Sequence, residues 1–174
     1  TRINLSSLDG SNGFRLDGEA VSDQLGLSVS SAGDVNGDGF DDVIIGARGI
    51  GSNGSSYSGL SYVVFGKTSG FDAVMNLSVL DGSNGFRLNG RTPLDYSGRS
   101  VNSAGDVNGD GFDDVIIGAY YAGHSNGIGA GSSYVVFGRA SGFDALIDLS
   151  DLDGSNGFRL DGEAMHDYSG RSVS

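Results

Sequence analysis

The feature that most constrains this chain is an internal repeat. The segment LDGSNGFRL begins at positions 8, 80 and 152, a constant spacing of 72 residues (80 − 8 and 152 − 80). Residues 31–102 align with residues 103–174 without insertion or deletion, and 49 of the 72 aligned positions are identical. A fixed period of this length is typical of proteins in which each unit packs on its neighbours. The chain therefore divides into 1–30, the end of a preceding repeat, and two full repeats, 31–102 and 103–174, all in one tandem-repeat domain.

Each repeat contains four short segments with the composition of β-strands, here named A to D. Strand A is Gly26–Ser31, a segment of small residues, and strand B is Asp42–Ala47, a continuous run of β-branched residues. Such a run is typical of a strand that is buried on both faces. Strand C is Ser61–Gly66, and strand D has the pattern of Gly13–Asp17, in which two apolar side chains share one face. No long window carries the apolar period of a helix, so the chain is predicted to be all-β.

Four antiparallel strands at a fixed period predict the blades of a β-propeller. A sheet of this size cannot bury both faces alone and needs neighbours, with the small residues of strand A nearest the axis. We expect two complete blades, preceded by an orphan outer strand at Gly13–Asp17 and followed by an orphan inner strand at Gly170–Ser174. A closed propeller typically has about four to eight blades, so ring closure needs further repeats or other copies of the chain. A linear solenoid of stacked sheets is the alternative.

The connection between strands A and B has the spacing of a calcium-binding loop. Residues 34–42 and their copy at 106–114 both read D-x-N-x-D-G-x-x-D. Side-chain oxygens at loop positions 1, 3, 5 and 9 can surround a cation, the glycine at position 6 permits the turn, and position 7 offers its carbonyl. Hard oxygen donors in a flexible loop suit Ca²⁺ better than Mg²⁺. The predicted ligands of about two calcium ions are Asp34, Asn36, Asp38, Phe40, Asp42, Asp106, Asn108, Asp110, Phe112 and Asp114.

The loop differs from an EF-hand at its end, because position 12 is Ile45 or Ile117 rather than a glutamate. Three carboxylates within about 5 Å repel one another by roughly 4 kcal/mol per pair at an effective dielectric near 20, and a divalent cation relieves that repulsion. The aspartates at position 8, Asp41 and Asp113, are expected to point away from the ion. The alternative is a solvated Asp/Asn/Gly turn that binds no metal.

The same residues resemble the FG-GAP repeat of integrin α-chain propellers and related bacterial surface proteins. The resemblance covers Leu25–Phe65 and Ser97–Phe137, through G-x-S-V, the metal loop, D-V-I-I-G-A and Y-V-V-F-G. The namesake "FG" differs, because Leu25 and Ser97 stand where the family has Phe. The resemblance implies a propeller blade with an adhesive function, in which the Asp and Asn side chains at loop positions 1, 3, 5 and 9 bind the metal.

The two full repeats differ mainly in two connections. The B–C connection reads RGIGSNGSSYSGL at 48–60 and YYAGHSNGIGAGS at 120–132, and the D–A connections also vary. In an antiparallel sheet both connections emerge at the end opposite the metal loops, which makes them the candidate surface for a glycan or protein ligand. Unselected variation in exposed loops is the alternative. The residues singled out on this surface are Tyr57, Tyr96, Tyr120, Tyr121, His124, His166 and Tyr168.

Composition and the lack of catalytic motifs argue against several functions. The formal net charge of −12 repels polyanions, so no nucleic-acid partner is expected. No apolar run reaches the roughly 20 residues of a membrane span. Cysteine is absent, which excludes a thiol nucleophile or a thiolate metal site. The sequence also offers no recognisable nucleophile–base pair, so the chain is not expected to be an enzyme.

Together these features predict a non-enzymatic, calcium-stabilised repeat module for adhesion, surface-layer or filament assembly, as part of a longer array. Its other expected partners are neighbouring repeats or further copies of itself, since unpaired strand edges recruit strands. An extracellular or cell-surface location is expected, because weak calcium sites need the calcium concentration found outside cells. The alternative is a glycan- or protein-binding propeller that acts through the variable B–C and D–A connections. An enzyme, or the accessory part of one, is the third hypothesis.

Overall fold

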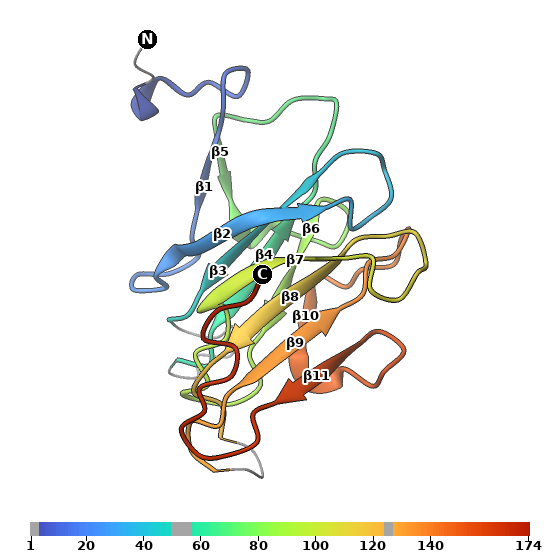
Figure 1. The fold of residues 1–174 in the computed structure, drawn as a ribbon. Coiled ribbons are helices and arrows are strands. Elements are labelled where there is room, and N and C mark those ends of the chain that lie inside the picture. Colours follow the sequence, from blue (N-terminus) through green and yellow to red (C-terminus); the bar gives the residue numbers. More distant parts are fainter. Residues whose placement is uncertain (1–3, 50–56, 124–126) are drawn as a thin grey trace.

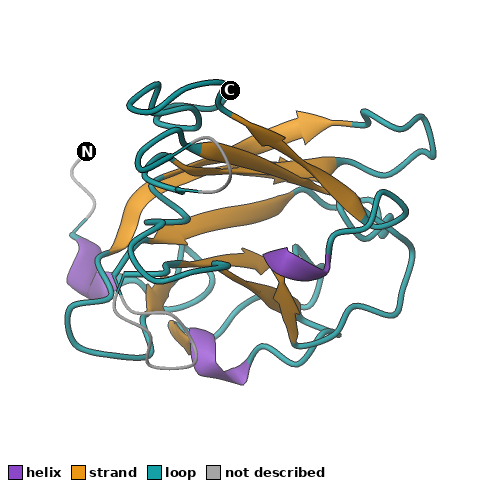
Figure 2. Ribbon diagram, turned by 90° about the horizontal axis from the view of Figure 1, so that it is seen from below, coloured by secondary structure: helices purple, strands orange, loops and turns teal. Residues whose placement is uncertain are grey.

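In the computed structural model, which describes residues 4–49, 57–123 and 127–174, the chain consists of β-strands and connecting loops. Figure 2 shows the strands in layers, with single-turn helices in the connecting segments. The predicted all-β class is confirmed. No helix in the described ranges has the length and apolar character needed to cross a bilayer. The described strands are β1 (Arg15–Asp17), β2 (Leu25–Gly33), β3 (Asp42–Ala47), β4 (Leu60–Val64), β5 (Val74–Asn76), β6 (Gly85–Asn89), β7 (Ser100–Gly105), β8 (Asp114–Ala119), β9 (Ser132–Val136), β10 (Leu146–Asp148) and β11 (Gly157–Asp161), and the 3₁₀ turns are η1 (Leu5–Ser7), η2 (Leu77–Val79) and η3 (Leu149–Asp151).

Two antiparallel sheets form the body of the molecule (Figure 1). β2, β3, β4 and β6 lie in that order in the first sheet, and β7, β8, β9 and β11 lie in that order in the second. These are strands A to D of the predicted repeat, in the predicted order. The register repeats as well, because Ile45 faces Tyr62 in the first sheet and Ile117 faces Tyr134 in the second. The near-identical sequences of the two repeats therefore build closely similar sheets.

The inner strands of the two sheets lie against each other through small side chains. The Ser28 hydroxyl of β2 accepts a hydrogen bond from the Val101 N–H of β7 at 3.0 Å. Beside these strands the two backbones approach so closely that a Cβ on Gly46 would lie 2.1 Å from the Gly98 carbonyl oxygen. The small residues of strand A and the glycine of strand B therefore allow neighbouring repeats to pack.

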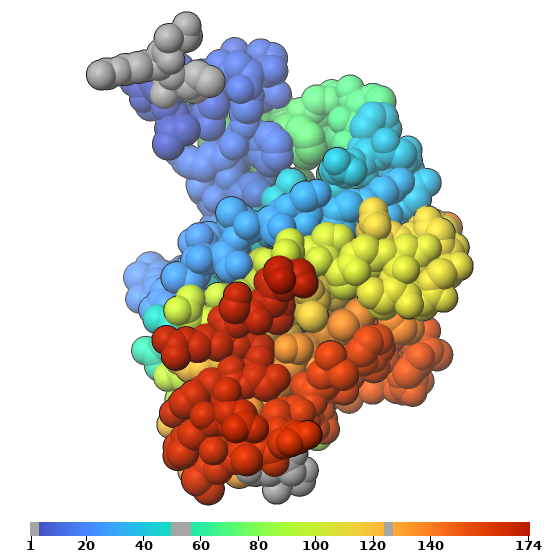
Figure 3. Space-filling model, viewed as in Figure 1, coloured from blue at the N-terminus to red at the C-terminus, as the bar shows by residue number. Residues whose placement is uncertain are grey.

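The main core lies between the two sheets, where one repeat covers the next. Figure 3 shows the N-terminal residues, in blue, at one end of the molecule and the C-terminal residues, in red, at the other. Ile44 of the first sheet and Val115 and Ile117 of the second are fully buried in one cluster. Phe143, from the C–D connection of the second repeat, stacks on Phe86 of the first with ring centroids 4.5 Å apart. Each such side chain contributes about 1.5–3 kcal/mol when buried, so the interface between repeats is a principal source of stability.

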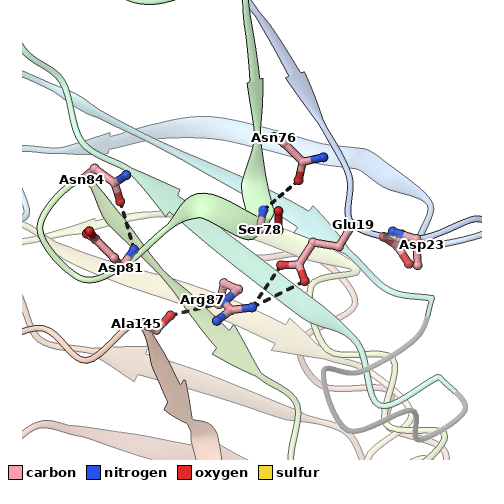
Figure 4. A network of polar contacts seen from close by, with 9 residues as sticks. Glu19, Asp23, Asn76, Ser78, Asp81, Asn84, Arg87 and Ala145 are labelled. Atoms are coloured by element: carbon pink, nitrogen blue, oxygen red, sulfur yellow. Dashed lines mark hydrogen bonds and ion pairs between the residues drawn. The ribbon is translucent and has the colours of Figure 1, made fainter.

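Each C–D connection also adds a short parallel strand to the preceding repeat, although its sequence has no clear strand pattern. β10 pairs with β6, and β5 pairs with β1. The backbone hydrogen bond from the Arg87 N–H to the Ala145 carbonyl, 3.0 Å long, reinforces the first of these pairs. Figure 4 shows the Arg87 side chain reaching Glu19 as well, with Nη1 and Oε1 3.3 Å apart. Backbone hydrogen bonds therefore join consecutive repeats along their outer edges.

The predicted inner strand at Gly170–Ser174 is wrong, because these residues form a turn, a bend and coil. The segment nevertheless lies against the second sheet in the same way that the segment beginning at Gly98 lies against the first sheet. A Cβ on Gly118 would lie 1.9 Å from the Gly170 carbonyl oxygen, which matches the approach of Gly98 to Gly46. β7 takes its ladder hydrogen bonds from β8, the next strand of its own sheet. Gly170–Ser174 has no such strand beside it among the described residues, so its backbone stays irregular.

Candidate metal centre

The two predicted metal loops join β2 to β3 and β7 to β8, and Figure 1 shows them at the same side of the molecule. Asp34 follows the last residue of β2, and Asp42 is the first residue of β3. The strands therefore hold both ends of the first loop. Between them Gly37 and Gly39 have φ values of 73° and 87°, a left-handed conformation that other residues rarely adopt. The glycine predicted to make the turn at position 6 does so.

Within the first loop, the side-chain oxygens turn inward onto the backbone. The Asp38 N–H donates to both Asp34 Oδ1 and Asn36 Oδ1 at 3.0 Å, and the Gly39 N–H donates to Asp34 Oδ2 at 2.9 Å. The Asp38 carboxylate accepts hydrogen bonds from the Phe40 N–H at 2.9 Å and from Asn36 Nδ2 at 3.1 Å. The side chains at loop positions 1, 3 and 5 are thus gathered over one small turn.

Asp42, at loop position 9, is the buried member of the set, with 1% of its surface exposed. Its carboxylate accepts hydrogen bonds from the Val35 N–H at 3.0 Å and the Gly66 N–H at 2.8 Å. Burial, to which the charges of Asp38 and Asp34 add, raises the pKa of Asp42 to about 6, although the two N–H donors oppose this shift. A buried carboxylate repelled by two others is a site whose charge a cation would balance.

The second loop repeats this arrangement in a more open setting. The Asp110 N–H donates to the side chains of Asp106 and Asn108 at 3.0 Å. Burial raises the pKa of Asp114, at position 9, and the charges of Asp110 and Asp106 add to the effect. Val107 is 50% exposed, whereas its counterpart in the first loop is 1% exposed. The difference arises because the second repeat covers the first loop.

The donor chemistry of both loops fits calcium, but in each loop the side-chain oxygens already accept hydrogen bonds from groups of the same loop. Carboxylate and amide oxygens are ligands that Ca²⁺ takes in proteins. Among the described residues, no three acidic or histidine side chains are grouped closely enough to hold a metal ion. The hydrogen bond between Asn36 and Asp38 uses a predicted ligand oxygen, so these side chains must turn for an ion to enter. Ligation by the carbonyls of Phe40 and Phe112 stays a prediction.

Asp113, at position 8 of the second loop, connects the two loops. Its carboxylate accepts a hydrogen bond from the Asp34 N–H at 2.8 Å, and its own N–H donates to the Asp34 carbonyl at 3.1 Å. The Phe112 ring lies beside Gly37, where a Cβ would be 2.3 Å from the ring. Neither contact could be predicted from the sequence, because two identical loops do not indicate which residues of one contact the other.

We expect Asp113→Ala to weaken the contact between the loops and to lower the free energy of unfolding by about 1–3 kcal/mol, because the Asp34 N–H loses its acceptor. The matched control is Asp41→Ala, which removes the same group from the exposed position 8 of the first loop and should change stability by less than about 0.5 kcal/mol. Urea unfolding of both variants in calcium-free buffer measures the difference. Equal stabilities would show that Asp113 does not hold the loops together.

The residues singled out on the variable connections come together in a ring cluster. Neighbouring rings of this cluster have centroids between 5.4 and 6.3 Å apart. His124 lies outside the described residues. The sequence predicted a shared surface, and the structure adds that its rings contact one another. The members are Tyr57, Tyr96, Tyr120, Tyr121, His166 and Tyr168.

Comparison with known proteins identifies the repeat. A family model for the FG-GAP repeat matches residues 25–64 and 97–136. The first match begins at the first residue of β2 and the second begins three residues before β7, and both end at the last residue of strand C, so each contains one complete predicted metal loop.

Curated relatives share this region. Integrin alpha pat-2 of Caenorhabditis elegans is 30% identical over 128 residues, which cover 74% of this chain and 10% of the relative. Integrin alpha-2 of Mus musculus is 33% identical over 96 residues, 55% of this chain and 8% of the relative. A phosphatidylinositol-glycan-specific phospholipase D of Bos taurus is 32% identical over 119 residues, 68% of this chain and 14% of the relative. The chain thus spans about a tenth of the length of these relatives. It carries FG-GAP repeats, and the family that its sequence predicted is confirmed.

Proposed function

We propose that the chain is a non-enzymatic, calcium-stabilised module for adhesion, or for surface-layer or filament assembly, within a longer array. The observation that carries this proposal is the pair of metal loops, each of which gathers oxygen-bearing side chains over one glycine turn. The FG-GAP match and the relatives named as integrin alpha chains support an adhesive role. The phospholipase D match covers 14% of that protein, so it does not indicate that the repeat itself is catalytic.

Each loop would hold one calcium ion, giving about two ions per chain. The ion would supply positive charge among three carboxylates, one of them buried, and would thereby link loop closure to folding. Asn36 and Asp38 would exchange their mutual hydrogen bond for contacts with the ion. The proposed ligands are Asp34, Asn36, Asp38, Asp42 and the Phe40 carbonyl in the first loop, and Asp106, Asn108, Asp110, Asp114 and the Phe112 carbonyl in the second.

The two sheets are, in this proposal, successive blades of a β-propeller. Each blade begins with an inner strand, β2 or β7, that starts a few residues before the sequence repeat, 31–102 or 103–174, in which its other three strands lie. Equivalent residues support the stacking of a further repeat on the first one. Val101 is 4% exposed because the first repeat covers it, whereas its counterpart Val29 is 61% exposed. Val29 lines an apolar pocket of about 420 Å³. A preceding repeat, or another copy of the chain, would cover this face as the first repeat covers the second. A linear stack of sheets is the alternative.

An extracellular or cell-surface location belongs to the same proposal. Calcium sites of extracellular modules typically have Kd values of about 10⁻⁴–10⁻³ M, which match the calcium concentration outside cells. Such sites would be empty in the cytosol, where these loops would keep their repulsive carboxylates unpaired. The relatives named as integrin alpha chains agree with this location.

Calorimetric titration of calcium into the metal-free chain tests the proposal. We expect about two ions per chain with Kd values near the millimolar range. Asp106→Ala should leave one ion, because the second loop loses its first ligand. Asp144→Ala, which removes an equal charge from an exposed position outside the loops, should leave both. If a folded wild-type chain takes up no calcium at millimolar concentration, the metal-stabilised module is wrong.

A further inference from the structure

The tetrapeptide Tyr-Ser-Gly-Arg occurs twice, at 96–99 and 168–171, in equivalent D–A connections. Tyr96 and Tyr168 have φ values of 54° and 53°, which are uncommon for large side chains. Both backbones are held there by the adjacent B–C connection, since the Tyr96 N–H donates to the Tyr57 carbonyl and the Tyr168 N–H to the Gly129 carbonyl, each at 2.9 Å. The two tetrapeptides therefore have the same fixed backbone conformation in successive repeats.

A pocket of about 330 Å³ is lined by the two tetrapeptides and the start of both B–C connections. Tyr121 and Tyr168 stack with their ring planes 18° apart and their centroids 6.3 Å apart. Tyr120 lies 6.0 Å from Tyr121 and 6.2 Å from Tyr168. Three aromatic rings and three guanidinium groups thus share one small cavity. Its lining residues are Arg48, Arg99, Tyr120, Tyr121, Tyr168 and Arg171.

The pocket is positively charged within an acidic chain. It contains three of the 10 basic residues, although the formal net charge of the chain is −12. Arg48 Nε donates to the Gln24 side chain at 2.7 Å. In the part of the chain that the structure describes, ion pairs form at Arg15, Arg87 and Arg159, and none forms at a pocket arginine. The Arg48 guanidinium also lies 5.9 Å from the centroid of the Tyr96 ring. Arg99 and Arg171 are therefore the pocket arginines that can turn to an anion from outside, and the planar shape of their guanidinium groups suits a carboxylate.

Several backbone N–H groups around the pocket already donate hydrogen bonds within the chain, which restricts how a ligand can be recognised. The Arg99 N–H donates to the Tyr96 carbonyl at 3.2 Å, and the Arg171 N–H donates to the Tyr168 carbonyl at 3.1 Å. The Tyr121 N–H donates to the Asp95 carbonyl at 3.4 Å. A peptide that binds by strand addition pairs its backbone with a free strand edge, and these N–H groups offer none. The ring faces and guanidinium groups are the recognition elements that the pocket offers.

We propose that this pocket binds a carboxylate-bearing sugar of the uronic acid class. The tyrosine rings would pack against the apolar face of the pyranose ring, and Arg99 and Arg171 would donate hydrogen bonds to its carboxylate. The sugar enters as a single acidic unit, because the negative charge of the whole chain repels a long polyanion. This inference goes beyond the proposed function, since it assigns a ligand to residues outside the metal loops.

Titration of the calcium-loaded chain with glucuronate, followed by NMR of the tyrosine ring signals, tests the proposal. We expect saturable binding at millimolar concentration. Arg171→Gln should weaken glucuronate binding about tenfold or more, because a hydrogen bond to a charged group is lost. Arg99→Gln should weaken binding to a similar degree. The control is Lys67→Gln, which removes the same charge beside the Phe71 ring, outside the pocket, and should leave the affinity unchanged. Circular dichroism establishes that each variant is folded.

Three comparison ligands test whether the pocket recognises a sugar that carries a carboxylate. Glucose, which lacks the carboxylate, and acetate, which lacks the ring, should each bind at least about tenfold more weakly than glucuronate. Equal binding of either one overturns the proposal, as does a glutamate-rich peptide that binds where glucuronate does not. Failure of glucuronate to bind a chain that still takes up calcium overturns the pocket proposal alone. Conversely, glucuronate binding by a folded chain that takes up no calcium would overturn the metal proposal and leave the pocket standing.

Discussion

Saturating calcium is expected to raise the midpoint of thermal unfolding by about 10–20 °C over that of the metal-free chain. A ligand that binds only the folded state stabilises it by about 2.7 kcal/mol per site at a hundredfold excess over its Kd, and two sites contribute twice this amount. One kcal/mol corresponds to about 2–4 °C for a chain of this size. The expected physical source is the charge of buried Asp42, whose pKa is raised by burial and by the carboxylates of Asp38 and Asp34, and of Asp114 in the second loop, which a bound cation would balance.

Differential scanning calorimetry with calcium, and with a chelator, measures this shift. The double variant Asp38→Ala/Asp110→Ala should lose most of the calcium response. The variant loses two repelling charges but also the acceptors of the Phe40 and Phe112 N–H groups, so the calcium shift is measured for each variant against its own metal-free form. The charge-matched control Asp41→Ala/Asp72→Ala, at two exposed positions, should keep the full response. Magnesium at the same concentration should give a smaller shift, because it is reluctant to lose its water. If the unfolding midpoint of the wild-type chain were the same with calcium and with chelator, the proposal would be contradicted.

The effect of calcium should extend beyond each loop, because the first loop forms part of the contact between repeats. The Val35 carbonyl accepts a hydrogen bond from the Arg139 N–H at 2.9 Å, and Asp113 holds the backbone of Asp34. Both partners belong to the second repeat. An ion that fixes the first loop therefore also fixes the surface on which the next repeat packs. In a tandem array, where stability depends on neighbouring interfaces, metal binding and assembly would be linked.

Most of the fold could be predicted because the sequence repeats almost unchanged. The run DVIIGA predicted a strand buried on both faces, and five of the six residues of both β3 and β8 are buried, including consecutive residues that point to opposite faces. β5 and β10 were missed, since strands of three residues leave no periodic pattern. Gly170–Ser174 was wrong for a different reason. Its sequence has the same local preference as β7, but a strand exists only where a partner supplies hydrogen bonds.

The sites were predicted in part, and again the limits are physical. Spacing predicted that the loop side chains gather over one turn, but it could not indicate that Asn36 and Asp38 hydrogen-bond each other. On the variable connections, the tyrosines were predicted because the segments 48–60, 91–97, 120–132 and 163–169 vary between repeats. Arg99 and Arg171 lie two residues past the D–A connections, so that comparison did not include them. Only the fold shows that they share a pocket with Tyr120 and Tyr121.

Gly46→Ala is expected to lower the free energy of unfolding by roughly 1–3 kcal/mol or more. The new Cβ would lie 2.1 Å from the Gly98 carbonyl oxygen, and that oxygen belongs to a backbone that cannot move without shifting β7. The cost comes from the contact alone, because Gly46 is not among the glycines with positive φ and alanine adopts its backbone freely. In a chain of this size, the loss corresponds to a fall of about 2–12 °C in the unfolding midpoint.

The comparison that isolates this contact uses two further glycines of ordinary φ. Gly118→Ala should be destabilising to a similar degree, since its Cβ would meet the Gly170 carbonyl oxygen at 1.9 Å in the same way. Gly123→Ala, on an exposed connection where the nearest atom would be 3.3 Å away, should change stability by less than about 0.5 kcal/mol. Thermal unfolding of all three in calcium-free buffer keeps metal binding out of the measurement. If Gly46→Ala were as stable as Gly123→Ala, then neighbouring repeats would not approach backbone to backbone, and the close packing that a propeller blade requires would be absent from this chain.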